Sequence, residues 1–177
     1  MLFISEIQTT APIEYDSILQ EMTYKTLQKL QISFLRVETD EMITMDDCVQ
    51  VNQKLNMKMV KTLFLCNRQQ TEFYLFVTTG DKSFNSKEFS SALNVSRVSF
   101  APADLMEKIL GTKIGAATVF SSLLDKTNMV KIVIDEDVTK EEWYGCSDGT
   151  RTGYLKIKTD QIINDFLPYT LHTPTII

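Results

Sequence analysis

The residue types that most often carry catalysis are scarce in this chain. It has a single histidine, His172, close to the C-terminal end, and three cysteines, Cys48, Cys66 and Cys146. A catalytic triad or Cys-His pair would have to be built from the tail, where chains are often poorly ordered, so we expect His172 to be a solvated tail residue. The cysteines show no Cys-x-x-Cys pair or other spacing typical of a metal site. The sequence therefore predicts chemistry without an imidazole base, a metal or a cofactor.

Two acidic pairs and one thiol have simple structural interpretations. Asp46-Asp47 and Glu141-Glu142 are adjacent in sequence, so their side chains diverge instead of meeting at one substrate. We expect both pairs to favour helix N-termini electrostatically. Cys66 follows an apolar run and is predicted to be a core or edge thiol. No Gly-x-Gly-x-x-Gly motif or P-loop occurs, which argues against a nucleotide-phosphate cradle.

Lys61 and Gly115 are the more promising candidates. Lys61 opens the apolar run Lys-Thr-Leu-Phe-Leu and could place its ammonium at the mouth of a pocket, as a point charge for phosphate or carboxylate. The alternative is a strand-end lysine whose stem covers apolar surface while its charge stays in water. Gly115 opens the small-residue segment Gly-Ala-Ala-Thr, which a turn alone would also explain. Composition and spacing leave both alternatives open.

Length and composition place the chain among ordinary globular proteins. Its 177 residues are 44% hydrophobic and 23% charged, which predicts one domain over residues 1–177 with a core of its own. No apolar run reaches the roughly 18 residues that would span a bilayer. The first residues include Glu6 and no basic region, unlike a signal peptide. We therefore expect a cytoplasmic protein without a membrane partner.

The net negative charge argues against one class of nucleic-acid partner, long duplex DNA. There are 18 lysines and arginines against 23 aspartates and glutamates, a net charge of −5. This argues against the broad basic surface with which non-specific proteins follow DNA, so no DNA partner is expected. A net negative charge is still compatible with a small, local phosphate-binding site.

The elements that would position these residues alternate irregularly along the chain. Hydrophobic periodicity and turn residues predict helices over residues 11–30, 86–93, 102–109 and 159–166, the last capped by Thr159, and a helix start at residues 44–47. Strands are predicted over residues 32–37, 60–66, 71–79, 97–101, 129–135 and 154–158. Residues 67–70 read as a hairpin turn, and residues 139–153 as a loop. With at least one hairpin, a mixed sheet in an α/β or α+β domain is favoured over a doubly wound parallel sheet.

Several runs together resemble the YbaK/ProX family of aminoacyl-tRNA editing domains, within it the free-standing, PrdX-like branch. The resemblance covers about residues 13–168 and is most specific at three places: the Lys-x-Leu-Phe-Leu strand, the Ser-Arg-x-Ser-Phe-Ala strand and the segment from Gly115 to Thr118. Supporting runs are LQKLQISFLRVETDE, ITMDDC, VKTLFLCNRQQTEFYLFVTT, LNVSRVSFAPADLMEKILGTKIGAATVFSSLLDK and VKIVIDEDV. The resemblance implies a YbaK-type mixed β-sheet, curled toward a barrel and flanked by helices.

The resemblance also implies an activity and a site. Relatives hydrolyse mischarged alanyl-tRNA(Pro), with the ribose hydroxyl of the tRNA helping to activate water. The family's lysine falls on Lys61, which would hold the phosphate of the terminal adenosine, and its loop glycine falls on Gly115, which would orient the water. Substrate-binding positions are Thr62, the expected pocket floor Ala116, Ala117 and Thr118, and also Val119, Ser147 and Arg151. The implied partners are an aminoacyl-tRNA acceptor end and, as a further candidate, a prolyl-tRNA synthetase.

This sequence departs from the family pattern at several of these positions. Val119 stands where the family has a loop proline, and Ser147-Asp148 and Arg151-Thr152 replace the frequent His-Pro and Asn-Thr pairs. Two alternatives to an alanyl-tRNA(Pro) deacylase therefore stay open. One is a diverged, non-catalytic module that binds tRNA or a synthetase, and the other is a deacylase for cysteinyl-tRNA(Pro).

Overall fold

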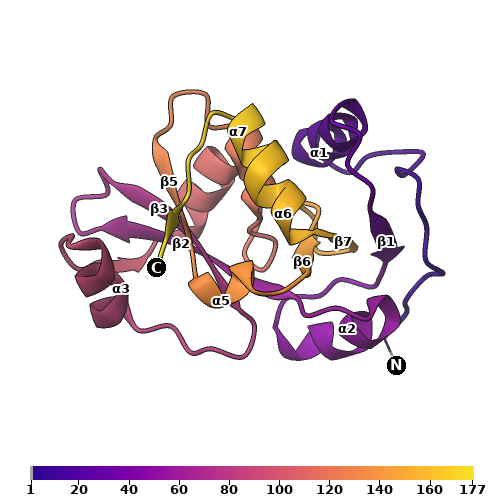
Figure 1. The fold of residues 1–177 in the computed structure, drawn as a ribbon, viewed down its shortest axis with the longest axis horizontal. Helices are drawn as coiled ribbons and strands as arrows, with labels where there is room; N and C mark the ends of the chain where they lie inside the picture. The colour runs from indigo at the N-terminus through magenta and orange to yellow at the C-terminus, as the bar shows by residue number, and fades with distance from the viewer. Residues whose placement is uncertain (1) are drawn as a thin grey trace.

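The computed structural model describes residues 2–177, and their strands form two sheets (Figure 1). The smaller sheet is antiparallel in the order β1–β7–β6, and the larger has the order β4–β2–β3–β5–β8. The strands are β1 (Leu35–Glu38), β2 (Val60–Asn67), β3 (Phe73–Thr79), β4 (Val98–Phe100), β5 (Val130–Ile134), β6 (Trp143–Ser147), β7 (Gly153–Lys158) and β8 (Thr175–Ile176). In the larger sheet β4, β2 and β3 are antiparallel, whereas β5 runs parallel to β3 and to β8. The predicted mixed α/β fold is thus confirmed.

Short helices cover both sheets. They are α1 (Ile18–Lys29), α2 (Val49–Leu55), α3 (Ser86–Leu93), α4 (Ala103–Leu105), α5 (Glu136–Thr139), α6 (Thr159–Gln161) and α7 (Leu167–Tyr169). Helical turns over Asp46–Cys48, Met106–Leu110, Val119–Leu123 and Ile162–Phe166 precede, extend or join them. None of the helices described is long and apolar enough to cross a membrane. The strands described close no barrel, and the predicted curl of the sheet remains a prediction.

The β2–β3 hairpin is formed as predicted. Aromatic and β-branched residues dominate both strands, and their antiparallel register runs from the pair Val60–Thr79 to the pair Cys66–Phe73. Asn67 closes the turn, because its Oδ1 accepts hydrogen bonds from the backbone amides of Thr71 and Glu72.

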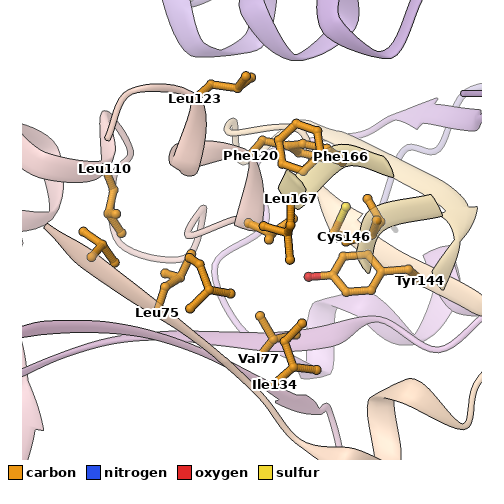
Figure 2. Packing of buried hydrophobic residues seen from close by; sticks show 14 of the residues in the cluster. Leu75, Val77, Leu110, Phe120, Leu123, Ile134, Tyr144, Cys146, Phe166 and Leu167 are labelled. Atoms are coloured by element: carbon orange, nitrogen blue, oxygen red, sulfur yellow. The ribbon is translucent and has the colours of Figure 1, made fainter. Parts of the chain in front are cut away.

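The main core lies between the larger sheet and the C-terminal helical segment. Figure 2 shows Leu75, Val77 and Ile134 of the larger sheet facing Leu167 and Tyr144. A second buried cluster fills the space between α2 and the smaller sheet, made of Val37, Met42, Cys48, Val51, Leu55, Met57, Met59 and Tyr154. Met59 belongs to this second cluster and Val60 packs against the main core, so the start of β2 lies between the two.

Several element predictions were wrong in detail. The first helix begins at Ile18, not residue 11, because the Ser17 side chain accepts a hydrogen bond from the Gln20 amide and caps the helix there. Thr159 does not cap the last helix: Lys158 occupies the cap position, and the buried Thr159 hydroxyl has no hydrogen-bond partner. Asp46 and Asp47 do lie in a first helical turn, as expected.

The region predicted as a loop over residues 139–153 contains a strand. Residues Trp143–Ser147 form β6, which pairs along its length with β7. Gly145 weakens the strand pattern in the sequence. A Cβ atom built there would lie 2.7 Å from Met57 Sδ and 3.0 Å from the Lys58 carbonyl oxygen, so these neighbours pack closely on the glycine. Glu141 and Glu142 precede this strand and do not begin a helix; instead, Glu141 accepts from Lys58 Nζ at 3.0 Å.

The prediction of a solvated His172 was also wrong. The side chain is buried, and its Nε2 lies 2.8 Å from Asp125 Oδ2. Its Nδ1 lies 2.8 Å from the Thr170 carbonyl oxygen, so both ring nitrogens face oxygen acceptors. Asp125 also accepts from the amides of Met129 and Val130, so this pair ties the C-terminal segment to the start of β5.

Candidate functional site

A cavity of about 420 Å³ lies where the two sheets approach each other. Its walls come from residues 42–48, from the first half of β2, from residues 100–106 and 114–117, and from β6 and β7. Most of the wall is apolar, with Met42, Met45, Met59 and Met106 contributing thioethers. No aspartate, glutamate or histidine lines it among the residues that the structure describes.

A gap along the edge of β2 opens this cavity. On one side of the gap Met59 bridges to Gly145 of β6, and on the other the Ala101 amide donates to the Phe64 carbonyl. Strand β4 pairs only from Leu65 onward. Backbone groups of alternate strand residues point to the same edge, so the amide and carbonyl of Thr62 point the same way as the Phe64 carbonyl, toward the gap.

The structure brings five of the predicted site residues to this one cavity. They are Lys61, Thr62, Gly115, Ala117 and Ser147, from β2, from the segment before Val119–Leu123 and from the end of β6. These positions are distant in sequence, and only the contact between the two sheets places them together.

Lys61 lines the cavity, and its ammonium has a backbone carbonyl as its partner. It pairs with Thr78 across the hairpin, and its Nζ donates to the backbone carbonyl of Lys82. Lys82 itself forms two ion pairs: its Nζ lies 2.8 Å from Asp135 Oδ2 and 2.6 Å from Asp137 Oδ2. Within the described residues Lys61 forms no ion pair, and the Lys82 carbonyl is its hydrogen-bond partner.

Gly115 adopts a backbone conformation that other residues avoid. Its φ is +88°, and a Cβ atom built there would lie 2.9 Å from the Ile43 carbonyl oxygen. Next to it, the Ala116 amide donates to the Lys113 carbonyl at 3.0 Å and closes a tight turn. The glycine therefore lets residues 42–45 pack directly on the segment.

Of the expected small-residue floor, only Ala117 lines the cavity. Ala116, Thr118 and Val119 are buried and point elsewhere, because the chain turns here into the helical segment Val119–Leu123. Val119 belongs to the main core, and Thr118 Oγ1 donates to the Ser147 carbonyl at 2.9 Å.

Ser147 lines the cavity, but its hydroxyl is occupied. Its Oγ donates to the Thr150 carbonyl at 2.7 Å and accepts from the Gly149 amide at 3.0 Å. These bonds close the turn between β6 and β7, residues 147–152, hereafter the β6–β7 turn. Arg151 lies outside the cavity lining; its Nε donates to the Ile114 carbonyl at 2.7 Å, and Nη1 lies 2.6 Å from Glu41 Oε1.

Asp148 anchors the β6–β7 turn from behind. Its carboxylate is fully buried and accepts from Tyr24 Oη at 2.8 Å, Gln20 Nε2 at 3.0 Å and Thr150 Oγ1 at 2.7 Å. Burial first, and then the Asp148 charge, raise the pKa of Tyr24 far above its ordinary value, so the phenol remains a donor. Sequence reasoning missed this cluster; its one local signal is that Gln20 and Tyr24 share a helix face at i, i+4 spacing.

Two thiols line the cavity without being activated. Burial raises the pKa of Cys48 to about 11 and that of Cys146 well above its ordinary value. Both therefore stay protonated near neutral pH and are poor nucleophiles. Cys66 is buried in the main core, as predicted. Among the described residues, the cavity lining thus combines one lysine with thiols that stay protonated and with hydroxyls, and it contains no imidazole or carboxylate.

Comparison with solved structures gives the same fold. The hypothetical protein APE2540 matches with a TM-score of 0.67 at 14% identity, over 86% of this chain and 95% of that one. A candidate trans-editing enzyme for prolyl tRNA synthetase matches with a TM-score of 0.64 at 13% identity, over 92% of this chain and 98% of that one.

Comparison of sequences identifies the family to which the chain belongs. The prolyl-tRNA editing protein ProX of Acetoanaerobium sticklandii is 28% identical over 112 residues, which cover 63% of this chain and 68% of that protein. Residues 39–164, most of the chain and including Lys61, Gly115 and Ser147, match the aminoacyl-tRNA editing domain. This chain therefore belongs to the family of aminoacyl-tRNA editing domains.

Proposed function

We propose that the chain, as a single editing domain, is a trans-acting deacylase that hydrolyses mischarged tRNA(Pro), with alanyl-tRNA(Pro) as its substrate. The observation that carries this proposal is that Lys61 and Gly115 line one largely apolar cavity, with no described carboxylate paired with the Lys61 ammonium. Similarity to a prolyl-tRNA editing protein supports the choice of tRNA. The expected setting is the cytoplasm, with a prolyl-tRNA synthetase as a candidate partner and no cofactor.

In this proposal Lys61 binds the phosphate of the terminal adenosine. An ammonium next to the monoanionic phosphodiester gives a charge-assisted contact, and Lys61 must only exchange the Lys82 carbonyl for the phosphate oxygen. The ester carbonyl would then lie over the gap in β2, near Thr62 and Ala117. Position and electrostatics supply the rate enhancement.

Hydrolysis requires no protein nucleophile. Water oriented by the backbone at Gly115 adds to the ester carbonyl carbon, and the tRNA ribose hydroxyl helps to take its proton. The bond between the carbonyl carbon and the ribose oxygen then breaks, and that oxygen receives a proton, leaving free amino acid and tRNA. This fits a cavity wall with no carboxylate or imidazole in the part of the chain described.

The test is a deacylation panel with the purified protein. Alanyl-, cysteinyl- and prolyl-tRNA(Pro) are incubated with and without enzyme, and the loss of labelled amino acid is followed. The proposal expects alanyl-tRNA(Pro) to be hydrolysed fastest and prolyl-tRNA(Pro) to be spared. Faster release of cysteine would make the chain a cysteinyl-tRNA(Pro) deacylase instead.

A non-catalytic binding module is the second candidate. The observation that favours it is that the Ser147 hydroxyl and the Arg151 guanidinium are both engaged within the protein, at positions where relatives line the aminoacyl pocket. It predicts tRNA(Pro) binding in a filter or gel-shift assay with no release above the uncatalysed rate. That result would exclude the deacylase.

A further inference from the structure

We propose that Arg151 is a positioning residue that fixes the Gly115 segment, residues 113–118, at the cavity. Only the effect on turnover rests on the proposed deacylase function; the effect on the segment itself does not. Arg151 Nε donates to the carbonyl of Ile114, the residue immediately before Gly115, at 2.7 Å. Its Nη1 lies 2.6 Å from Glu41 Oε1, at the start of the residues that pack on Gly115.

The same turn also holds the segment on the other side of Gly115. Thr118 Oγ1 donates to the Ser147 carbonyl at 2.9 Å. The β6–β7 turn therefore binds Ile114 before the glycine and Thr118 after it. Between these two points, the hydrogen bond from the Ala116 amide to the Lys113 carbonyl and the close packing of the Ile43 backbone further restrict the Gly115 backbone.

The β6–β7 turn can hold the Gly115 segment in place because the turn is itself held by hydrogen bonds to other elements. Asp148 ties it to α1 through Tyr24 and Gln20. The Arg151 carbonyl accepts from the Met42 amide at 2.9 Å and from Tyr154 Oη at 3.0 Å. The guanidinium thus joins three segments that surround the cavity but are remote in sequence.

Geometry favours arginine over lysine here. The planar guanidinium carries donors in a rigid fork and can bind the Ile114 carbonyl and the Glu41 carboxylate at once, whereas an ammonium is a single point charge. The Arg151 side chain is 22% exposed and that of Glu41 is 59% exposed. The exposed ion pair contributes little, so the bond to Ile114 is the contact that positions the segment.

The experiment combines turnover with amide exchange. Arg151→Ala, Arg151→Lys and Glu41→Gln are compared with Arg68→Ala, a matched change in the exposed turn between β2 and β3. Each variant is assayed on alanyl-tRNA(Pro) and by hydrogen exchange at the Ala116 amide, with β3 amides as the internal reference. Arg151→Ala is also assayed with added guanidinium well below denaturing concentrations.

We expect Arg151→Ala to lower kcat about tenfold or more, with KM nearly unchanged, because a displaced Gly115 segment misplaces water without removing a substrate contact. The exchange rate of the Ala116 amide should rise while the β3 amides stay protected, and guanidinium should restore part of kcat in this variant alone. The lysine in Arg151→Lys should restore less of kcat than added guanidinium does. In Glu41→Gln, kcat should fall about twofold at most.

Three results would overturn the inference. The first is wild-type kcat and Ala116 exchange in Arg151→Ala. The second is a rise in KM alone, which would make Arg151 a substrate contact. The third is a loss that guanidinium does not restore, with faster exchange throughout the chain. If the wild-type protein releases no amino acid, the proposed function fails, and Ala116 exchange alone then decides whether Arg151 positions the segment.

Discussion

At the residue scale, two lysines that meet at the hairpin have opposite roles. Lys82 is held by Asp135 and Asp137, and its backbone carbonyl receives the Lys61 ammonium. Hydrogen bonding to these carboxylates raises the pKa of Lys82 above its ordinary value. The Lys82 charge therefore anchors the loop after β3, whereas we propose that the Lys61 charge binds the phosphate of the substrate.

The anchor predicts a pH dependence of stability. Burial alone would raise the pKa of Asp135, but hydrogen bonds from Lys82, Thr78 and the Asp137 amide outweigh it and lower the pKa. A carboxylate with a lowered pKa stabilises the fold above its unfolded pKa of about 4, and this stability is lost as the pH falls further, through the folded pKa. Urea unfolding between pH 3 and pH 7 should show this loss. Asp135→Asn should flatten it, and an unchanged slope would contradict the role of the pair.

Asp148 should be the costliest polar residue of the β6–β7 turn to change. In Asp148→Asn an amide group would face the donors of Tyr24, Gln20 or Thr150, leaving a buried group unsatisfied. The expected loss in the free energy of unfolding is about 2–3 kcal/mol, measured by urea denaturation. Tyr24→Phe removes only one donor and should cost about 1 kcal/mol. Equal stability of Asp148→Asn and wild type would show that the carboxylate does not anchor the turn.

At the element scale, a strand could be predicted where the composition of its own side chains favours a β-strand. The hairpin of β2 and β3 follows from two dense β-favouring runs and a polar turn. Strand β6 was missed because Gly145 breaks the pattern, although Met57 and the Lys58 carbonyl pack closely on this glycine. These neighbours are distant in sequence, so no local pattern could reveal the contact.

Gly115 is a second glycine that packs closely on a residue distant in sequence, and a substitution can test this contact. Gly115→Ala would place a Cβ against the Ile43 backbone in a left-handed conformation. We expect a loss of about 1–3 kcal/mol in the free energy of unfolding. Deacylation should fall as well, because residues 42–45 or the glycine itself must move. Wild-type stability with full activity would show that neither the conformation nor the contact matters.

At the scale of the whole molecule, the C-terminal segment is locked by a buried pair. His172→Ala would remove the imidazole from the buried Asp125 carboxylate, which would keep only its hydrogen bonds from the Met129 and Val130 amides. The expected loss is about 3 kcal/mol in the free energy of unfolding, measured by thermal or urea denaturation. His172 was predicted to be solvated because position in the chain does not reveal tertiary contacts. Wild-type stability of His172→Ala would show that the buried pair does not hold the C-terminal segment in place.

The site could be predicted only in part for the same reason. The family resemblance selects Lys61, Thr62, Gly115, Ala117 and Ser147, which the fold brings to one cavity. It could not show that Thr118 and Val119 turn into the core or that Arg151 binds the Ile114 carbonyl, since these depend on how the two sheets meet.

The most direct test of the central claim is the rate of alanyl-tRNA(Pro) hydrolysis by Lys61→Ala under single-turnover conditions. The matched control is Lys58→Ala, an exposed lysine nearby that pairs with Glu141 outside the cavity. We predict that Lys61→Ala loses about a hundredfold in rate, because the phosphate loses its cation, while Lys58→Ala keeps the wild-type rate. Hydrolysis by Lys61→Ala at the wild-type rate would contradict the account.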